Sequence, residues 1–159
     1  MIEAFAIAAI DHFGENEAEQ SPHADELERA YHWENAGHIA KYEVYCILND
    51  GAIVGGAVLK INTETWHNKL DLFFIFKEYM NQGLGLNAWK AIEQKYPLTV
   101  VWELITPYFE KRNIAFYVNK CGFRIIEYFN KYHPDPLAPF PVDEKEDDGG
   151  YFLFAKEMK

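Results

Sequence analysis

The stretch that most constrains the fold of this chain is residues 73–96, FFIFKEYMNQGLGLNAWKAIEQKY. An apolar, aromatic run over residues 72–76 is followed by a polar turn over residues 77–82. After Gly83-Leu84-Gly85, apolar residues return at the three- and four-residue spacing of one helix face, at Leu84, Ala88, Ala91 and Ile92. The pattern predicts a strand, a glycine turn and a helix.

A glycine turn at the start of a helix is a natural site for anions. The first N–H groups of a helix lack acceptors within it, and the positive end of the helix dipole lies there. Phosphate groups are the usual ligands of such a site. Glycine is needed where the backbone approaches a ligand closely or adopts a conformation that side chains disfavour. Two glycines can equally form a simple tight connection, so the rest of the chain has to decide.

The residues before this stretch predict a strand, short helices and three further strands. Residues 2–10 favour a strand, although their alanines would also suit a helix, and residues 15–37 favour one or two short helices. Asn49-Asp50-Gly51 is a strong hairpin signal between strands at 41–48 and 52–62. Gly55-Gly56 inside the second of these predicts a bulge or a close backbone approach. The next strand is expected at 69–76.

The residues after the glycine turn predict a strand, a helix and a final strand pair. Pro97 should end the first helix, and residues 98–106 should form a fifth strand, parallel to the fourth through a right-handed crossover. Pro107 should open a helix over 108–120 that Gly122 ends. The last two strands are expected at 124–131 and 151–158, with a long acidic loop between them.

Composition narrows the class of protein. The chain has 159 residues, of which 49% are hydrophobic, and shows no domain boundary, so a single domain over 1–159 is expected. The net charge of −10 argues against nucleic acid as a partner and would attract an amine, although most of it can be a solvated surface. No run has the length of a membrane span and no basic leader is present, so a cytoplasmic location without membrane contact is expected. Cys46, Cys121 and the six histidines show no metal-ligand spacing, so no metal is expected.

The chain resembles the GNAT superfamily of N-acetyltransferases. The family turn reads Arg/Gln-x-x-Gly-x-Gly/Ala after a strand, and here Met80 to Gly85 supply both glycines but Met80 replaces the Arg or Gln. Cys121-Gly122-Phe123 resembles the Gly-Phe that follows the second motif helix. The resemblance covers nearly the whole chain. It implies an α+β (mixed α/β) fold: a mixed, mostly antiparallel sheet of about seven strands, with splayed parallel strands four and five, flanked by about four helices.

The resemblance also implies a reaction. Acetyl-CoA would bind between strands four and five, and its acetyl group would pass to a primary amine of a small molecule or peptide by direct attack in a ternary complex. The pantetheine arm would pair with strand four and the pyrophosphate would lie on the turn. The residues that this assigns to acetyl-CoA are Phe74, Ile75, Phe76, Met80, Asn81, Gln82, Gly83, Leu84, Gly85, Leu86, Asn113 and Tyr117.

Three residues are candidates for catalysis. Asp71 lies on the fourth strand where many relatives carry Glu, and Glu103 is a carboxylate within an apolar run; each is a candidate general base or an ordinary strand-face carboxylate. Tyr117 is the candidate donor to the leaving thiolate. It lies five residues before Gly122, whereas relatives usually have the tyrosine four before, so it needs a local irregularity of the helix. Asn113 is likewise closer to the tyrosine than in relatives.

Two other functions remain open at this level. One is a CoA-binding or acyl-CoA-binding module of the same fold with little turnover, and the other is a nucleotide-binding protein. The second lacks the Gly-Lys-Ser/Thr sequence of nucleotide triphosphatases. The acceptor should be set by the helices before Gly37 and the loop after Lys131. A homodimer through the aromatic last strands is an expectation by analogy alone.

Overall fold

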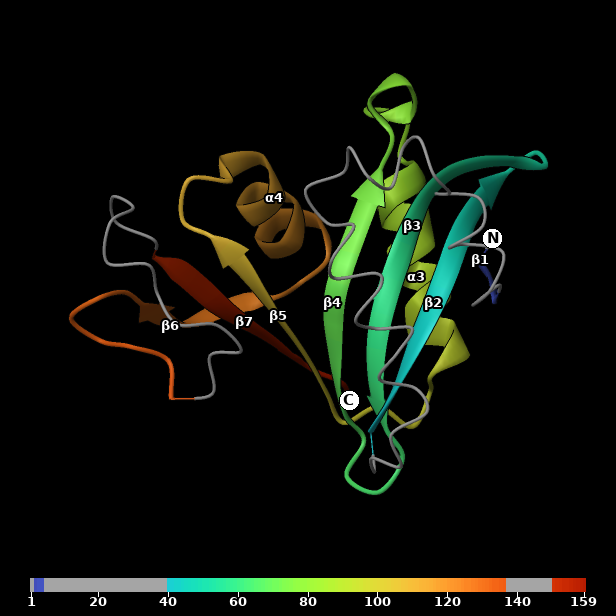
Figure 1. The fold of residues 1–159 in the computed structure, drawn as a ribbon. Coiled ribbons are helices and arrows are strands. Elements are labelled where there is room, and N and C mark those ends of the chain that lie inside the picture. The colour runs from blue at the N-terminus through green and yellow to red at the C-terminus, as the bar shows by residue number, and fades with distance from the viewer. Residues whose placement is uncertain (1, 5–39, 137–149) are drawn as a thin grey trace, which may run out of the picture. The chain divides into compact units, whose positions relative to one another are not determined.

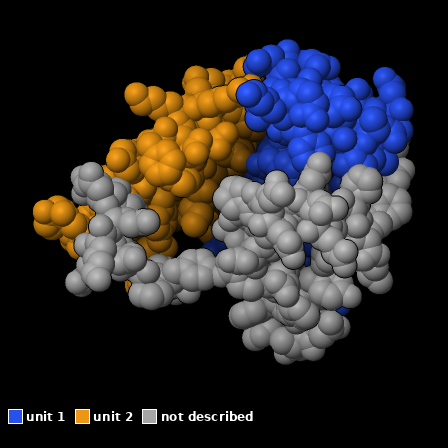
Figure 2. Space-filling view, turned by 45° about the horizontal axis from the view of Figure 1, so that its top comes forward, with its two compact units in different colours: residues 1–100 blue, residues 101–159 orange. Residues whose placement is uncertain are grey.

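The computed structural model describes residues 2–4, 40–136 and 150–159. It contains two compact units, residues 1–100 and residues 101–159, which Figure 2 shows in blue and orange. The helices expected over 15–37, the end of the first expected strand and most of the long acidic loop lie outside the described residues. The single domain expected over 1–159 stays a prediction.

The first unit is an antiparallel sheet whose strands follow one another in chain order (Figure 1). Its strands are β1 Ile2–Ala4, β2 Ala40–Asn49, β3 Ala52–Asn62 and β4 His67–Ile75. The strands expected at 41–48, 52–62 and 69–76 are thus confirmed to within two residues at each end. The hairpin between β2 and β3 is confirmed as well, since Asp50 and Gly51 both adopt positive φ, 51° and 81°.

Both irregularities predicted near Gly55 occur. A Cβ on Gly55 would lie 2.1 Å from the carbonyl oxygen of Phe74, so only glycine fits this approach of β3 to β4. Ile47 pairs with Gly55, and Leu48 pairs with Ile53, which leaves Val54 as the extra residue of a β-bulge. Glycine here therefore serves the contact between the two strands.

Helix α3, Leu84–Lys95, follows a 3₁₀ turn, η1, at Lys77–Tyr79 and ends before Pro97 as predicted. It covers one face of the sheet of the first unit (Figure 1), where Ala88 packs with Ile47 and Val54. Its buried residues are Ala88, Trp89 and Ile92, so the predicted face was nearly right but omitted Trp89. The opposite face of this sheet is apolar too, because Val44, Cys46, Val58 and Leu72 form a second cluster, with Phe74 and Phe76 against it.

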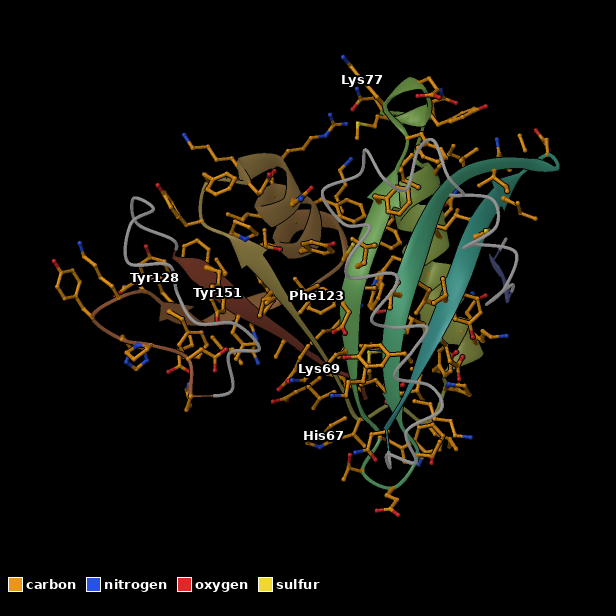
Figure 3. The ribbon with its side chains drawn as sticks, in the orientation of Figure 1. His67, Lys69, Lys77, Phe123, Tyr128 and Tyr151 are labelled. Carbon is orange, nitrogen blue, oxygen red and sulfur yellow. The ribbon has the colours of Figure 1, made fainter. Side chains whose placement is uncertain are left out.

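The second unit contains a smaller antiparallel sheet in the order β5, β7, β6 and a helical segment. Its elements are β5 Val101–Pro107, α4 Lys111–Ala115, the π-helix η2 Phe116–Lys120, β6 Arg124–Phe129 and β7 Tyr151–Glu157. Tyr128 on β6 and Tyr151 at the start of β7 project from this sheet (Figure 3). The final strand pair is therefore confirmed.

Two boundaries in this region were predicted wrongly. The strand expected at 98–106 begins only at Val101, because the Val100 N–H instead donates to the Trp66 carbonyl (2.9 Å) within the first unit. Pro107 does not open a helix. It ends β5, where it pairs with Tyr151, and α4 begins at Lys111.

The described residues contain six strands of six or more residues, the three-residue β1, and two α-helices. That is fewer than the roughly four helices expected, and the remaining ones were expected over residues outside the described part. The expected parting of strands four and five stays a prediction. In the part of the chain that the structure describes, no helix is both long and apolar enough to span a membrane.

Candidate functional site

The glycine turn has the backbone conformation that its sequence predicts. Gly83, the N-cap of α3, has φ 77° and ψ 0°, in the left-handed region. A Cβ at this position would have nothing within 4 Å, so the need for glycine comes from the backbone conformation. Asn81, two residues earlier, also has a positive φ of 63°. The turn therefore has two residues in the left-handed region, which most side chains disfavour.

The start of α3 offers several N–H groups to a ligand. The first hydrogen bond of the helix runs from the Asn87 N–H to the Gly83 carbonyl, 3.1 Å. The N–H groups of Leu84, Gly85 and Leu86 come before it and have no acceptor within the helix. The first turn holds no acidic residue, and no side chain caps the helix. An anion at this point would meet donors that have no acceptor within the helix, and the positive end of the helix dipole.

The turn is held directly to β4. The Phe76 N–H donates to the Val54 carbonyl (2.8 Å), which extends the pairing with β3 just past the end of β4. The Tyr79 N–H donates back to the Phe76 carbonyl (2.9 Å), and the Gln82 side-chain amide donates to the Glu78 carbonyl (3.4 Å). Of the residues expected to meet the pantetheine arm, Phe74 and Ile75 pair with Gly56 and Gly55, respectively. The expected strand and turn segments of the acetyl-CoA site are thus continuous in one unit.

Asp71 lies in a β-bulge that its sequence did not reveal. Val58 pairs with Leu72, and Leu59 pairs with Leu70, so Asp71 is the extra residue of β4 at this register shift. Its side chain is exposed. Bulges bend a strand and re-aim a side chain, and they are frequent beside active sites. Its role as a base stays a prediction, but the residue is not an ordinary member of the strand.

Tyr117 is buried in an aromatic cluster of the second unit. Its ring centroid lies 5.8 Å from that of Phe123, which Figure 3 labels, and 6.0 Å from that of Phe154 on β7. Burial, and to a smaller extent the nearby Cys121, raises the pKa of Tyr117 above its ordinary value. The hydroxyl therefore keeps its proton at neutral pH and can donate a hydrogen bond.

The irregularity that Tyr117 needs is present in the helix. Residues 116–120 form a π-helix, in which the Cys121 N–H donates to the carbonyl of Phe116, five residues earlier, at 3.1 Å. Tyr117 is 7% exposed, and Val118, at the spacing usual in relatives, is 37% exposed. Within the π turn, the tyrosine is thus buried and its neighbour is exposed. Asn113, in the preceding α-helical turn, is exposed.

Glu103 lies on the face of its sheet that points away from Tyr117. Its neighbours along β5, Trp102 and Leu104, are buried, and Leu104 pairs with Phe154, which contacts the tyrosine ring. Successive side chains of a strand point to opposite faces. Glu103, half-buried and paired with Ala155, therefore points to the other face. If Glu103 accepts a proton and Tyr117 donates one, the two residues act on opposite faces of the sheet that contains β5.

Sequence reasoning missed a cluster around Glu43. The hydroxyl groups of Tyr45 and of Tyr96, the C-cap of α3, both donate to the Glu43 carboxylate. Tyr96 is 53 residues from Glu43, so no local pattern marks this contact. The cluster fastens the end of α3 to β2. Within the described ranges, no group of three or more His, Cys, Asp or Glu side chains is arranged to hold a metal ion.

Comparison with known proteins places the chain in a family. A family model described as "Acetyltransferase (GNAT) family" matches residues 7–123. The Bacillus subtilis (strain 168) protein YrkN is 49% identical over 161 residues, which covers 99% of this chain and 84% of that protein.

Solved structures share the fold. A GNAT family acetyltransferase from Elizabethkingia anophelis with acetyl-CoA bound is 20% identical, with a TM-score of 0.68 over 99% of this chain and 97% of that one. An IAA acetyltransferase from Bacillus cereus ATCC 14579 is 18% identical, with a TM-score of 0.65 over 99% of each chain. These structures support the fold alone, whereas the family model, which matches residues 7–123, shows the family. The chain belongs to the GNAT acetyltransferase family.

Proposed function

We propose that this protein is an N-acetyltransferase that moves the acetyl group of acetyl-CoA to a primary amine of a small molecule or peptide. The observation that carries the proposal is the glycine turn at the start of α3, with Gly83 in the left-handed conformation and, after it, N–H groups that have no acceptor within the helix. Membership of the GNAT family and the acetyl-CoA bound to the Elizabethkingia structure support the same donor.

The pyrophosphate of acetyl-CoA would lie against the main chain of the turn, from Met80 to Leu86. Met80 has no charge or N–H donor in its side chain, so the backbone N–H groups and the helix dipole would carry this contact. The pantetheine amides would pair with main-chain groups of Phe74, Ile75 and Phe76 other than the Phe76 N–H, which donates to the Val54 carbonyl. The resemblance also assigns Asn113 and Tyr117 to acetyl-CoA, and that assignment stays a prediction.

The reaction would be a direct displacement. The amine nitrogen attacks the thioester carbon, a C–N bond forms, the C–S bond breaks, and CoA leaves as a thiolate. The amine proton passes to a base, for which Asp71 is the first candidate because its bulge sets it apart from the strand pattern. Glu103 is the second candidate.

Tyr117 would act as a hydrogen-bond donor to the leaving sulfur. A cysteine-like thiol has a pKa of about 8.5, and burial raises the pKa of Tyr117 above the ordinary value for a phenol. Complete transfer of the phenolic proton to the thiolate would therefore be uphill. A hydrogen bond to the developing charge stabilises the thiolate without that transfer.

The test is an assay of acetyl transfer from acetyl-CoA to a panel of primary amines. The release of free CoA thiol measures the rate of transfer. We expect turnover with at least one amine. Asp71→Asn should lower kcat about 10²-fold, the lower end of the range for a positioned base, whereas the matched Glu103→Gln should lower it less. Equal losses in the two variants would contradict the assignment of Asp71.

A second candidate function is a binding module of the same fold with weak turnover, which the loss of the usual Arg or Gln at Met80 favours. Acetyl-CoA binding without transfer to any amine would support it. Thermal stabilisation by ATP but not by CoA would instead support a nucleotide-binding protein. The cytoplasmic location and the homodimer stay predictions.

A further inference from the structure

We infer that the π turn at Phe116–Lys120 is a one-residue insertion that sets the direction of Tyr117, and that this turn makes the tyrosine a working donor in this chain. The inference rests on the proposed function and names a positioning device for it. It concerns the helix of the second unit and the residues packed against it.

The helix changes its hydrogen bonding at one point. The Phe116 N–H donates to the carbonyls of both Arg112 and Asn113, so α-helical and tighter bonding overlap there. After Phe116 the spacing widens, as the Cys121 N–H reaches back five residues to the Phe116 carbonyl. The Phe123 N–H then donates to the Tyr117 carbonyl at 3.0 Å. A single wide turn of this kind corresponds to one extra residue in an α-helix.

The end of the helix is held in place by buried residues. The extra residue must therefore change the direction of the side chains that come before this end. Cys121 and Phe123 are buried at 3% and 1% exposure, and Gly122 between them has φ 82°. Counted back from this fixed end along a regular α-helix, Val118 would occupy the inward position four residues before Gly122. One residue turns an α-helix by about 100°. With the π turn, Tyr117 is inward and Val118 is exposed.

The helix can be shortened by one residue on either side of the tyrosine. Asn119 and Ala115 are both exposed, and the deletion of either one shortens the helix by one residue. Removing Asn119 leaves Tyr117 four residues before Gly122, so a regular α-helix keeps it inward. Removing Ala115 leaves it five residues before Gly122, so a regular helix turns it away. The two deletions are therefore matched in size and differ in the predicted direction of the tyrosine.

The experiment combines each deletion with Tyr117→Phe and measures kcat with the amine found above, alongside a crystal structure of the Asn119 deletion. In the parent chain, we expect Tyr117→Phe to lower kcat about 10²-fold. Tyr117→Phe should lower kcat by the same factor in the Asn119 deletion. In the Ala115 deletion it should lower kcat hardly any further. The crystal structure should show a regular α-helix with Tyr117 still buried.

A double substitution tests the same idea without a deletion. In Tyr117→Val/Val118→Tyr the tyrosine moves to the family spacing while the π turn remains, and we expect kcat as low as in Tyr117→Phe. Full activity of this double variant, or an equal cost of Tyr117→Phe in both deletions, would overturn the inference. The proposed function fails separately, if the parent chain neither binds acetyl-CoA nor acetylates an amine. In that case the crystal structure still decides whether the π turn directs Tyr117.

Discussion

Gly55 occupies a point where no side chain fits between two strands. A Cβ there would lie 2.1 Å from the Phe74 carbonyl oxygen and 3.0 Å from the Ile75 Cα, both of them backbone atoms that cannot rotate away. We expect Gly55→Ala to lower the free energy of unfolding by about 1–3 kcal/mol, the usual cost of forcing extra volume into a packed site. Urea denaturation measures this.

The matched control is Gly51→Ala in the β2–β3 turn. A Cβ at Gly51 meets nothing within 4 Å, so the cost there comes only from its φ of 81° and should be about 1 kcal/mol. A smaller cost at Gly55 than at Gly51 would show that β3 and β4 can separate. In that case the close approach would not define the position of the Phe74 main chain.

At the level of single residues, the sequence predicted the conformations and the bulge that glycine marks, but not the bulge at Asp71. Glycine often indicates a position that is left-handed or too crowded for a side chain. Such positions are occupied by Gly51, Gly55, Gly83 and Gly122. The bulge at Asp71 has no such marker, because it arises from the register between two strands. The only sign of the extra helical residue near Tyr117 was the five-residue spacing from Tyr117 to Gly122, which differs from the four-residue spacing usual in the family.

Among the elements, the end of α3 depends on a shared carboxylate. Burial, and then the hydrogen bond to Glu43, raises the pKa of Tyr96 above its ordinary value, and the pKa of Tyr45 is raised by the same causes. The unfolded chain therefore loses these protons first as the pH rises. Their contribution to stability is fully present below about pH 10, the ordinary pKa of tyrosine, and is lost as the pH rises from there toward the folded value.

We therefore expect the free energy of unfolding to fall above about pH 10, and to fall less steeply in Tyr96→Phe. Each such tyrosine contributes up to about 1.4 kcal/mol per pH unit in this range. Urea denaturation at several alkaline pH values measures the slope. Tyr132→Phe is the control, because Tyr132 is 85% exposed and its removal should leave the slope unchanged. An unchanged slope in Tyr96→Phe would mean that this hydroxyl is not coupled to folding.

Element prediction succeeded where the signal was local. Turn residues mark the ends of the strands that hairpins join, and they also mark the ends of the helix between Gly83 and Pro97. The prediction failed at Val100 and Pro107, whose hydrogen bonding and pairing are with Trp66 and Tyr151, residues distant in the sequence. A proline at the first turn of a helix and a proline at the end of a strand look the same in sequence.

For the whole molecule, the family could be recognised from the sequence because its most specific motif is also local. The glycine turn and the Gly122-Phe123 ending are short segments, and the family model spans both of them. The acceptor could not be predicted, because its expected determinants are residues 15–37 and the loop after Lys131, whose sequences carry little pattern. The site proposed for acetyl-CoA can therefore be tested before the acceptor is known.

The most direct test is isothermal titration of acetyl-CoA into the purified protein and into Gly83→Glu. The substitution strains the left-handed turn and adds a negative charge where the pyrophosphate is expected, so we expect micromolar binding by the parent and at least about a 100-fold loss in the variant. Gly51→Glu is the control, since it imposes a similar strain at φ 81° on the β2–β3 turn and should bind as the parent does. Absence of binding by the parent, or equal binding by Gly83→Glu, would contradict the assignment of the glycine turn to acetyl-CoA.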